Sequence, residues 1–321
     1  MIYKLILFFN LISFALSDYG GGYAGSGFRF GNNAREISLG GSLASEYNSG
    51  FNAFSNPAFL YKVNEVEFGS SMFVMSLDRS IQVISVSRAL SRRAGTSLSF
   101  FKSGTKRISE ISYNKDLLNS DLSFSDSYFM LSFGAGKKNF SIGFNLKAYL
   151  QSASLGTVGN YDANGIGFDI GLYYKINRRL SLGAKFENII GSINHKSGVS
   201  IPYEEVIPSR YIISVRGVLS RKFTMFLSEE VMEINNDYYF RTNLSGEYAL
   251  NNFNIPIMIR LGLRQAQWTY IEEYEFKFNP CFGLGLNTTI FSDKVLHIDY
   301  AFDYGLEKQG ISNLFSLTLE L

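Results

Sequence analysis

The clearest pattern along the chain is a two-residue alternation of apolar and polar positions. Across residues 140–150 every even-numbered position is apolar, whereas the odd-numbered positions hold Ser, Gly, Asn, Lys and Tyr. The same alternation recurs over residues 255–263 and 296–304. A period of two predicts a strand with one apolar and one wet face, and a tilted strand needs about 9–11 residues to cross a bilayer. These segments are therefore predicted to be strands long enough to span a membrane.

Segments of this kind recur through most of the chain. Counting all of them predicts about fourteen strands, at residues 63–76, 79–88, 94–102, 126–134, 139–150, 164–175, 179–190, 209–219, 222–233, 237–249, 254–264, 276–290, 294–304 and 312–321. No water reaches the bilayer core, so every strand edge there has to be paired, and a closed barrel is the arrangement that achieves this. The pattern predicts an all-β fold, a transmembrane outer-membrane β-barrel of about fourteen antiparallel strands.

The connections between these strands differ in length at the two ends of the predicted barrel. If the first strand leaves the periplasm, the periplasmic connections are short, as at 136–138 and 177–178. Most connections at the other end are long, as at 103–125, 151–163 and 191–208. Short turns on one side and long loops on the other are typical of outer-membrane barrels. The cell outer membrane is therefore the expected location.

Composition agrees with this class and excludes others. The chain has 29 Phe, 20 Tyr and 30 Gly but only 5 Pro, whereas a soluble β-sandwich, the alternative fold, would need fewer aromatic residues. Thirty basic and 28 acidic residues give a formal net charge of +2, which provides no electrostatic basis for binding nucleic acid. The single cysteine excludes an intramolecular disulfide and a cysteine-rich metal site.

The beginning of the chain reads as a targeting segment followed by a non-barrel segment. Lys4 precedes an apolar run that ends in small residues, which fits a secretory signal peptide. We expect residues 1–17 to be this signal peptide and residues 18–62 to be a Gly-rich leader and luminal plug. Residues 63–321 then form the transmembrane barrel.

The plug assignment depends on the stretch before the first strand. Its small residues at 40–45 suit a backbone packed tightly inside another structure, and Asn56 followed by Pro57 has the chemistry of a helix start. A linker is the alternative interpretation of the same stretch. If the plug moves when a ligand passes, Asn56, Pro57 and Ala58 are the candidate gate residues.

The barrel places the polar member of each alternating pair toward the lumen. The charged residues predicted to face inward are Lys147, Asp169, Lys185, Glu187, Arg216, Arg241, Glu247, Arg260, Arg264 and Asp299. Two uses fit such a set: binding of a polar ligand, or salt bridges that hold the lumen or the plug in place. The second is favoured, because cations and carboxylates are roughly balanced.

Candidate catalytic chemistry is sparse. A Ser-His pair needs a histidine with an orienting partner, and the only histidines are His195, in a predicted loop, and His297, two residues from Asp299 on one strand. These two and Cys281 lie far apart in the sequence and do not suggest a metal site. We therefore expect no catalytic residues, no metal, no cofactor and no enzymatic activity.

Several short motifs in a fixed order carry a family resemblance. They are Ala34-Arg35, Leu39-Gly40-Gly41, Asn56-Pro57-Ala58, Lys147-Ala148-Tyr149, Asp169-Ile170-Gly171-Leu172, Pro208-Ser209, Gly246-Glu247-Tyr248, Arg260-Leu261-Gly262 and Asp299-Tyr300-Ala301-Phe302. In this succession the chain resembles the PorV/PorQ family of outer-membrane proteins, itself similar to the FadL-type long-chain fatty-acid transporters.

The resemblance implies a fourteen-stranded barrel with the N-terminal segment folded inside. It also implies a role in transport of hydrophobic compounds across the outer membrane, or alternatively a type IX secretion component that docks exported proteins. A non-transporting structural surface protein is the third possibility. The expected partners are outer-membrane lipid, a hydrophobic small-molecule ligand and secretion-system proteins.

Overall fold

The computed structural model describes most of the chain from residue 24 onward. The described residues are 24–321 without 42, 76–77, 112–116, 156–158, 196–201, 235–236, 251–255, 266–277, 291–293 and 305–310. The signal peptide predicted at 1–17 and the start of the leader lie outside these residues. No helix in the described part of the chain has both the length and the apolar character needed to cross a bilayer.

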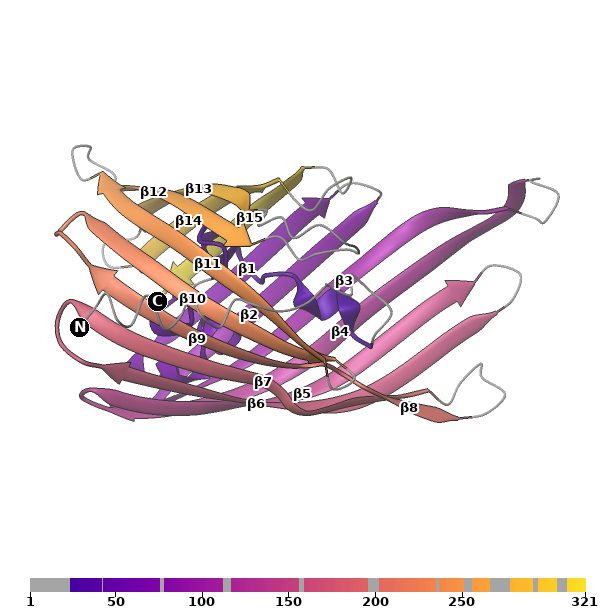
Figure 1. Cartoon of the computed structure of the whole chain (residues 1–321), viewed down its shortest axis with the longest axis horizontal. Coiled ribbons are helices and arrows are strands. Elements are labelled where there is room, and N and C mark those ends of the chain that lie inside the picture. Colours follow the sequence, from indigo (N-terminus) through magenta and orange to yellow (C-terminus); the bar gives the residue numbers. More distant parts are fainter. Residues whose placement is uncertain are drawn as a thin grey trace.

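The described residues form one large antiparallel sheet that closes on itself (Figure 1). Its strands are β1 (Val66–Met75), β2 (Arg79–Ser91), β3 (Ala94–Ile111), β4 (Leu117–Lys137), β5 (Phe140–Leu155), β6 (Asn160–Lys175), β7 (Leu180–His195), β8 (Tyr203–Val206), β9 (Ser209–Val218), β10 (Phe223–Ile234), β11 (Asp237–Leu250), β12 (Ile257–Gln265), β13 (Phe278–Ile290), β14 (Lys294–Asp303) and β15 (Ser312–Glu320). Apart from β8, consecutive strands pair with one another, and β1 pairs with β15 to close the ring. The short β8 pairs only with the far end of β7, and β9 pairs with the near end. Fourteen strands of the described chain thus form the barrel, which confirms the predicted fold.

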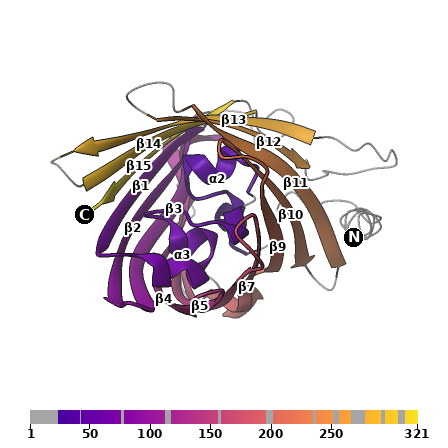
Figure 2. The same ribbon diagram turned by 90° about the vertical axis from the view of Figure 1, so that its left-hand side faces the viewer.

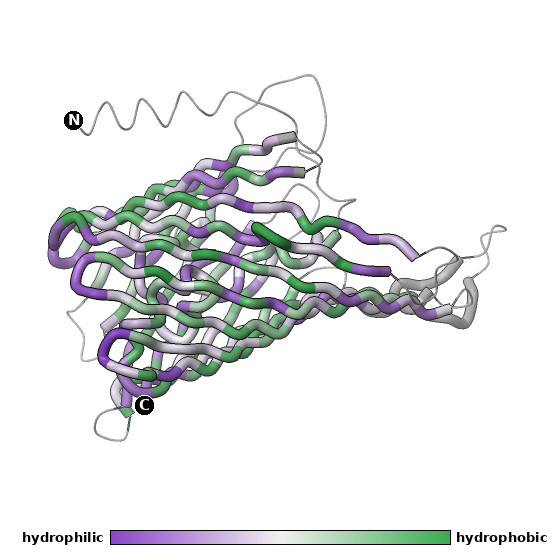
Figure 3. Tube along the Cα trace, turned by 90° about the horizontal axis from the view of Figure 1, so that it is seen from below, coloured by the Kyte–Doolittle hydropathy of each residue, from purple (hydrophilic) through white to green (hydrophobic). Residues whose placement is uncertain are grey.

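The register places the predicted apolar positions on the outside. On β5, Phe140 and Ile142 are 51% and 48% exposed, whereas Asn145 is fully buried in the interior. Apolar and polar residues alternate in this way along many of the strands (Figure 3). An exposed apolar outer surface is costly in water and favourable in lipid, so the outside of the barrel is suited to a membrane.

The strands at one end are longer than the alternation indicated. The predicted connection 103–125 is mostly strand, because β3 continues to Ile111 and β4 begins at Leu117. The predicted connections 151–163 and 191–208 likewise contain the far ends of β5, β6 and β7 and all of β8. Beyond the lipid neither face has to be apolar, so backbone pairing continues where the alternation is lost. These strands project from one end of the barrel (Figure 1).

The segment before β1 folds into short helices within the ring of strands (Figure 2). They are η1 (Ser26–Arg29), α2 (Ala34–Ser38), η2 (Leu43–Ser45), α3 (Asn52–Ser55) and η3 (Pro57–Lys62). The predicted helix start is confirmed: the Asn56 side chain accepts a hydrogen bond from the Ala58 N–H at 3.0 Å, and Pro57 is the first residue of η3. We call residues 24–64 the N-terminal segment. It brings polar and apolar side chains against the inner surface of the barrel.

Candidate functional site

Glycines on the barrel wall provide the surface on which the N-terminal segment lies. A Cβ atom added to any of them would come within 3 Å of an atom of that segment. They are Gly69, Gly95, Gly134, Gly136, Gly143, Gly171, Gly183, Gly262 and Gly283. The closest approach is at Gly183, where the Ala44 carbonyl oxygen would lie 1.8 Å from an added Cβ. The backbone of the N-terminal segment therefore touches the backbone of the wall on several strands.

The predicted gate residues lie at the centre of this contact. Asn56 is fully buried, and its side-chain amide donates to the carbonyl oxygens of Ala44 at 2.7 Å, Leu172 at 3.0 Å and Ala184 at 3.3 Å. Pro57 and Ala58 are buried against the wall glycines. These contacts join the turn to β6 and β7 as an anchor. A gating role for the three residues stays a prediction.

Replacing Asn56 by aspartate tests the anchor. The carboxylate keeps the acceptor for Ala58 but cannot donate to the three carbonyl oxygens, and a buried charge without a partner is strongly unfavourable. We expect Asn56→Asp to lower the free energy of unfolding by about 3 kcal/mol or more. Urea unfolding of the lipid-reconstituted barrel measures the change. The same substitution at Asn139, in the exposed β4–β5 turn, is the control and is expected to leave stability unchanged within about 0.5 kcal/mol.

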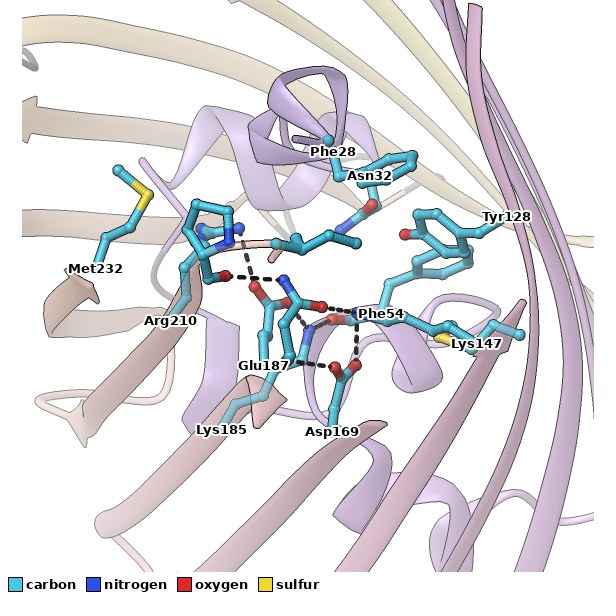
Figure 4. A pocket seen from close by; sticks show the side chains of 15 residues that line it. Phe28, Asn32, Phe54, Tyr128, Lys147, Asp169, Lys185, Glu187, Arg210 and Met232 are labelled. Atoms are coloured by element: carbon cyan, nitrogen blue, oxygen red, sulfur yellow. Dashed lines mark hydrogen bonds and ion pairs between the residues drawn. The ribbon is translucent and has the colours of Figure 1, made fainter. Parts of the chain in front are cut away.

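Four of the predicted lumen-facing charges come together on β5, β6 and β7 (Figure 4). Lys147 Nζ lies 2.8 Å from Asp169 Oδ2, and Lys185 pairs with Glu187. The second Asp169 oxygen accepts the backbone N–H of Asn188 at 2.9 Å. All four charged side chains are buried. Because each charge already has a partner, the arrangement resembles a structural network more than an open ligand site.

This network continues through Arg210 and Glu230, which the sequence did not single out, to the predicted Arg241. Arg210 Nη1 lies 2.9 Å from Glu187 Oε2, and its Nη2 lies 2.6 Å from Glu230 Oε1. Arg241 Nε donates to the other oxygen of Glu230 at 2.9 Å. Burial raises the pKa of the Glu36 carboxyl in the N-terminal segment, and the nearby Lys185 and Arg210 oppose that rise. The N-terminal segment thus adds a carboxylate close to the cations of the wall.

A second network lies on the opposite wall and includes three of the predicted residues. Arg260 Nε donates to Glu247 Oε2 at 2.7 Å, and its Nη1 donates to Asp299. Arg35 of the N-terminal segment also pairs with Glu247, at 3.0 Å. A polar cavity of about 160 Å³ adjoins these side chains and extends to His297.

The remaining predicted charges are held elsewhere. Arg264 pairs with Asp303 at 2.8 Å, and Arg216 pairs with Glu46 of the N-terminal segment. The lumen-facing candidates are therefore divided among separate groups rather than gathered in one site. Alternation along a strand predicted which face each residue occupies. It carried no information on which strands would place two charges side by side.

Aromatic side chains form a chamber next to the first network. Phe28 of the N-terminal segment stacks on Tyr149 with ring centroids 4.9 Å apart and meets Tyr128 edge-on at 5.2 Å. Tyr128 in turn stacks on Phe101 at 5.0 Å. Only about 30 Å³ remains between these rings and the charges around Lys147 (Figure 4). We call this group, with Phe54, the aromatic chamber.

The two histidines have separate surroundings. His195 pairs with Glu205 at 3.1 Å, whereas His297 lies 2.8 Å from Asn287 and 3.0 Å from Glu320. Among the residues that the structure describes, no group of three or more His, Cys, Asp and Glu side chains is placed to hold a metal ion.

Comparison with known proteins places this architecture among solved structures. No family model matches the chain, and no curated protein sequence matches it. The CymD monoaromatic hydrocarbon channel superposes with a TM-score of 0.60 at 14% identity, covering 90% of this chain and 96% of that one. The Pseudomonas putida toluene transporter TodX gives 0.60 at 13% identity, covering 90% and 96% of the two chains. A Pseudomonas aeruginosa FadL homologue gives 0.57 at 11% identity, covering 90% and 97%. The chain therefore has the fold of the FadL-like outer-membrane barrels.

Proposed function

We propose that this protein is an outer-membrane barrel that moves small hydrophobic compounds across the outer membrane. The observation that carries the proposal is the aromatic chamber, a cluster of aromatic rings inside a barrel whose neighbouring luminal charges are already paired. Solved structures with the same fold include a monoaromatic hydrocarbon channel and a toluene transporter, which supports this substrate class. We propose no catalytic role and no cofactor.

In this proposal the N-terminal segment is the luminal plug. A hydrophobic compound enters at the end where β3 to β7 project and reaches the aromatic chamber first. Stacking on rings and loss of apolar surface from water favour binding there. The wall glycines keep most of the N-terminal segment in place, whereas Phe28 belongs to the short helix η1 at its beginning.

Removing the Phe28 ring tests the chamber as the binding compartment. Phe28→Ala is expected to raise the uptake of a labelled aromatic hydrocarbon into proteoliposomes several-fold, because the space vacated by the ring has the size and chemistry of a single-ring compound. Native mass spectrometry should then show the hydrocarbon retained by the variant.

The control for this experiment is Phe129→Ala on β4. Phe129 is half exposed on the lipid-facing surface, so its truncation leaves the chamber unchanged. Equal uptake by wild type and Phe28→Ala, with neither above protein-free vesicles, would remove the support for transport.

Docking of exported proteins, as in a PorV-like type IX secretion component, is the second candidate. The projecting strands favour it, since β4 has 21 residues and β15 has 9, and the excess provides a surface outside the lipid. Pull-down of exported proteins by wild type, and its loss when the β3–β4 hairpin is shortened, would support this function. If the barrel neither transports a hydrocarbon nor captures exported proteins, a non-transporting structural surface protein becomes the favoured function.

A further inference from the structure

Four turns at the short-turn end of the barrel each carry two adjacent basic residues. They are Arg92-Arg93 between β2 and β3, Lys137-Lys138 at the end of β4 and in the turn to β5, Arg178-Arg179 between β6 and β7, and Arg221-Lys222 between β9 and β10. At this end β7 pairs directly with β9, so the four turns follow one another around the rim. Paired strands lie about 4.8 Å apart, which puts neighbouring turns about 10 Å apart and the whole group on an arc of about 30 Å. We call these eight residues the basic crescent.

The turns of the basic crescent carry a local excess of positive charge. These turns contain no acidic residue. Within the described part of the chain no ion pair joins a carboxylate to Arg92, Arg93, Lys137, Lys138, Arg178, Arg179 or Arg221. The luminal arginines and lysines, in contrast, are paired with carboxylates. With a formal net charge of only +2 for the whole chain, this arc is a local concentration of positive charge.

Each turn of the crescent adjoins an apolar side chain on the outer surface. Leu90, Phe140, Ile176 and Leu219 are between 42% and 60% exposed. Each of them lies two residues from the nearer cation of its turn. A cation two residues from an apolar side chain at the edge of the lipid-facing band lies at the depth of the lipid headgroups.

We propose that the basic crescent binds the phosphate groups of anionic phospholipids in the leaflet at the short-turn end. If the proposed function is correct, this leaflet is the periplasmic one. The inference rests on the proposed function for this assignment of the leaflet. Clusters of four to eight Lys and Arg residues beside a membrane surface attract anionic lipids. A soluble acidic protein would account for the charge, but not for an apolar neighbour at the same spacing in all four turns. The geometry therefore points to lipid.

The test compares two lipids bound by the intact protein. The purified barrel is equilibrated in mixed micelles with equal amounts of phosphatidylglycerol and phosphatidylethanolamine, and bound lipids are counted by native mass spectrometry. We expect wild type to retain the anionic lipid at least about fivefold more than the zwitterionic one. Replacing all eight cations by glutamine should bring the ratio close to one.

Smaller variants separate position from net charge. Arg178→Gln with Arg179→Gln removes two charges from the crescent, whereas Arg79→Gln with Lys102→Gln removes two from the parts of β2 and β3 that lie toward the opposite end of the barrel. The first pair should reduce the preference and the second should leave it unchanged. Equal retention of both lipids by wild type, or equal effects of the two pairs, would overturn the proposal. So would binding of an acidic periplasmic protein in place of lipid.

Hydrocarbon uptake by the same preparations distinguishes this inference from the proposed function. Absence of a lipid preference in wild type, with normal uptake, overturns the crescent alone. Absent uptake with an intact lipid preference overturns transport alone and leaves the crescent supported.

Discussion

Adding one methyl group at Gly183 is expected to release the N-terminal segment from the barrel wall. In Gly183→Ala the new Cβ would lie 1.8 Å from the Ala44 carbonyl oxygen, 2.3 Å from its carbonyl carbon and 2.6 Å from the Ser45 Cα. These atoms belong to the backbone and cannot rotate away as the end of a flexible side chain would. Ser45 is also tied to the wall through a hydrogen bond of 2.9 Å between its hydroxyl and that of Ser214.

The expected result is a loss of about 3 kcal/mol or more in the docking of the segment, since overpacking commonly costs about 1–3 kcal/mol and here the obstructing atoms are fixed. Trypsin should then cleave at Arg35 and Lys62 at least about 100-fold faster than in wild type. Conductance across a planar bilayer should rise in parallel, because the displaced segment no longer fills the lumen.

Gly217→Ala is the matched control for Gly183→Ala. Gly217 is also a strand glycine, on β9, but an added Cβ there has no atom within 4 Å. Its cleavage rate and conductance should equal those of wild type. If Gly183→Ala and Gly217→Ala behave alike, the close contact between the two backbones is not what holds the segment.

The glycine contacts bear on how a plug could work in this barrel. Gly95, Gly134, Gly171, Gly183 and Gly262 lie on five different strands, and together they contact the N-terminal segment at residues 38–40, 44–45 and 56–60. Movement of the whole segment would break all these contacts together, along with the hydrogen bonds of Asn56. A local movement at its beginning, around Phe28, would break far fewer. These contacts favour an N-terminal segment that stays anchored along most of its length and moves only near Phe28.

Much of the fold could be predicted because lipid imposes a simple rule on the outer surface. Wherever a strand faces hydrocarbon, alternate residues have to be apolar, so both the strands and their inward faces followed from the pattern. The rule does not apply to the parts of the strands that extend beyond the lipid. The far halves of β3 and β4 and the short β8 are formed by backbone pairing, which leaves no periodic signal.

Asn188 shows a second limit of the pattern. The sequence predicted one regular strand over residues 179–190, but Asn188 has a left-handed backbone with φ of 53° and its N–H turns inward to Asp169. Ile189 and Ile190 are then both exposed. A bulge of this kind depends on the neighbouring strand, here β6, where the register shifts on either side of Asp169. Alternation within β7 alone could not reveal it.

The luminal charges illustrate the same limit for the site. Parity along each strand was enough to place Lys147, Asp169, Lys185 and Glu187 inside the barrel. Lys147 and Asp169 meet across two strands, and the central member of the chain of ion pairs, Arg210, connects β7 to β10. Which charges meet depends on the stagger between strands, which sequence alternation does not encode.

Glu230 is the luminal carboxylate whose loss should cost the most stability. It is 5% exposed and lies between two guanidinium groups, with Arg210 Nη2 at 2.6 Å and Arg241 Nε at 2.9 Å. Glu230→Gln keeps the shape but removes the charge, and the amide NH₂ then faces a guanidinium group that also only donates. Breaking a buried ion pair from one side costs about 3–5 kcal/mol, because the remaining charge is left uncompensated. We expect a loss of that size in the free energy of unfolding, measured by urea titration of the reconstituted barrel.

Two further variants test whether the charge is the cause. Glu229→Gln makes the same chemical change one residue away, where the carboxylate accepts only from the Thr242 hydroxyl, and should cost less than about 1 kcal/mol. Glu230→Gln combined with Arg241→Gln removes one uncompensated cation, so it should be more stable than Glu230→Gln alone by about 1–3 kcal/mol. If the effects of the two substitutions simply add, the charge of Glu230 does not act through Arg241. If the double variant is more stable than the sum of the single effects predicts, the paired charges across β9, β10 and β11 hold this part of the wall together.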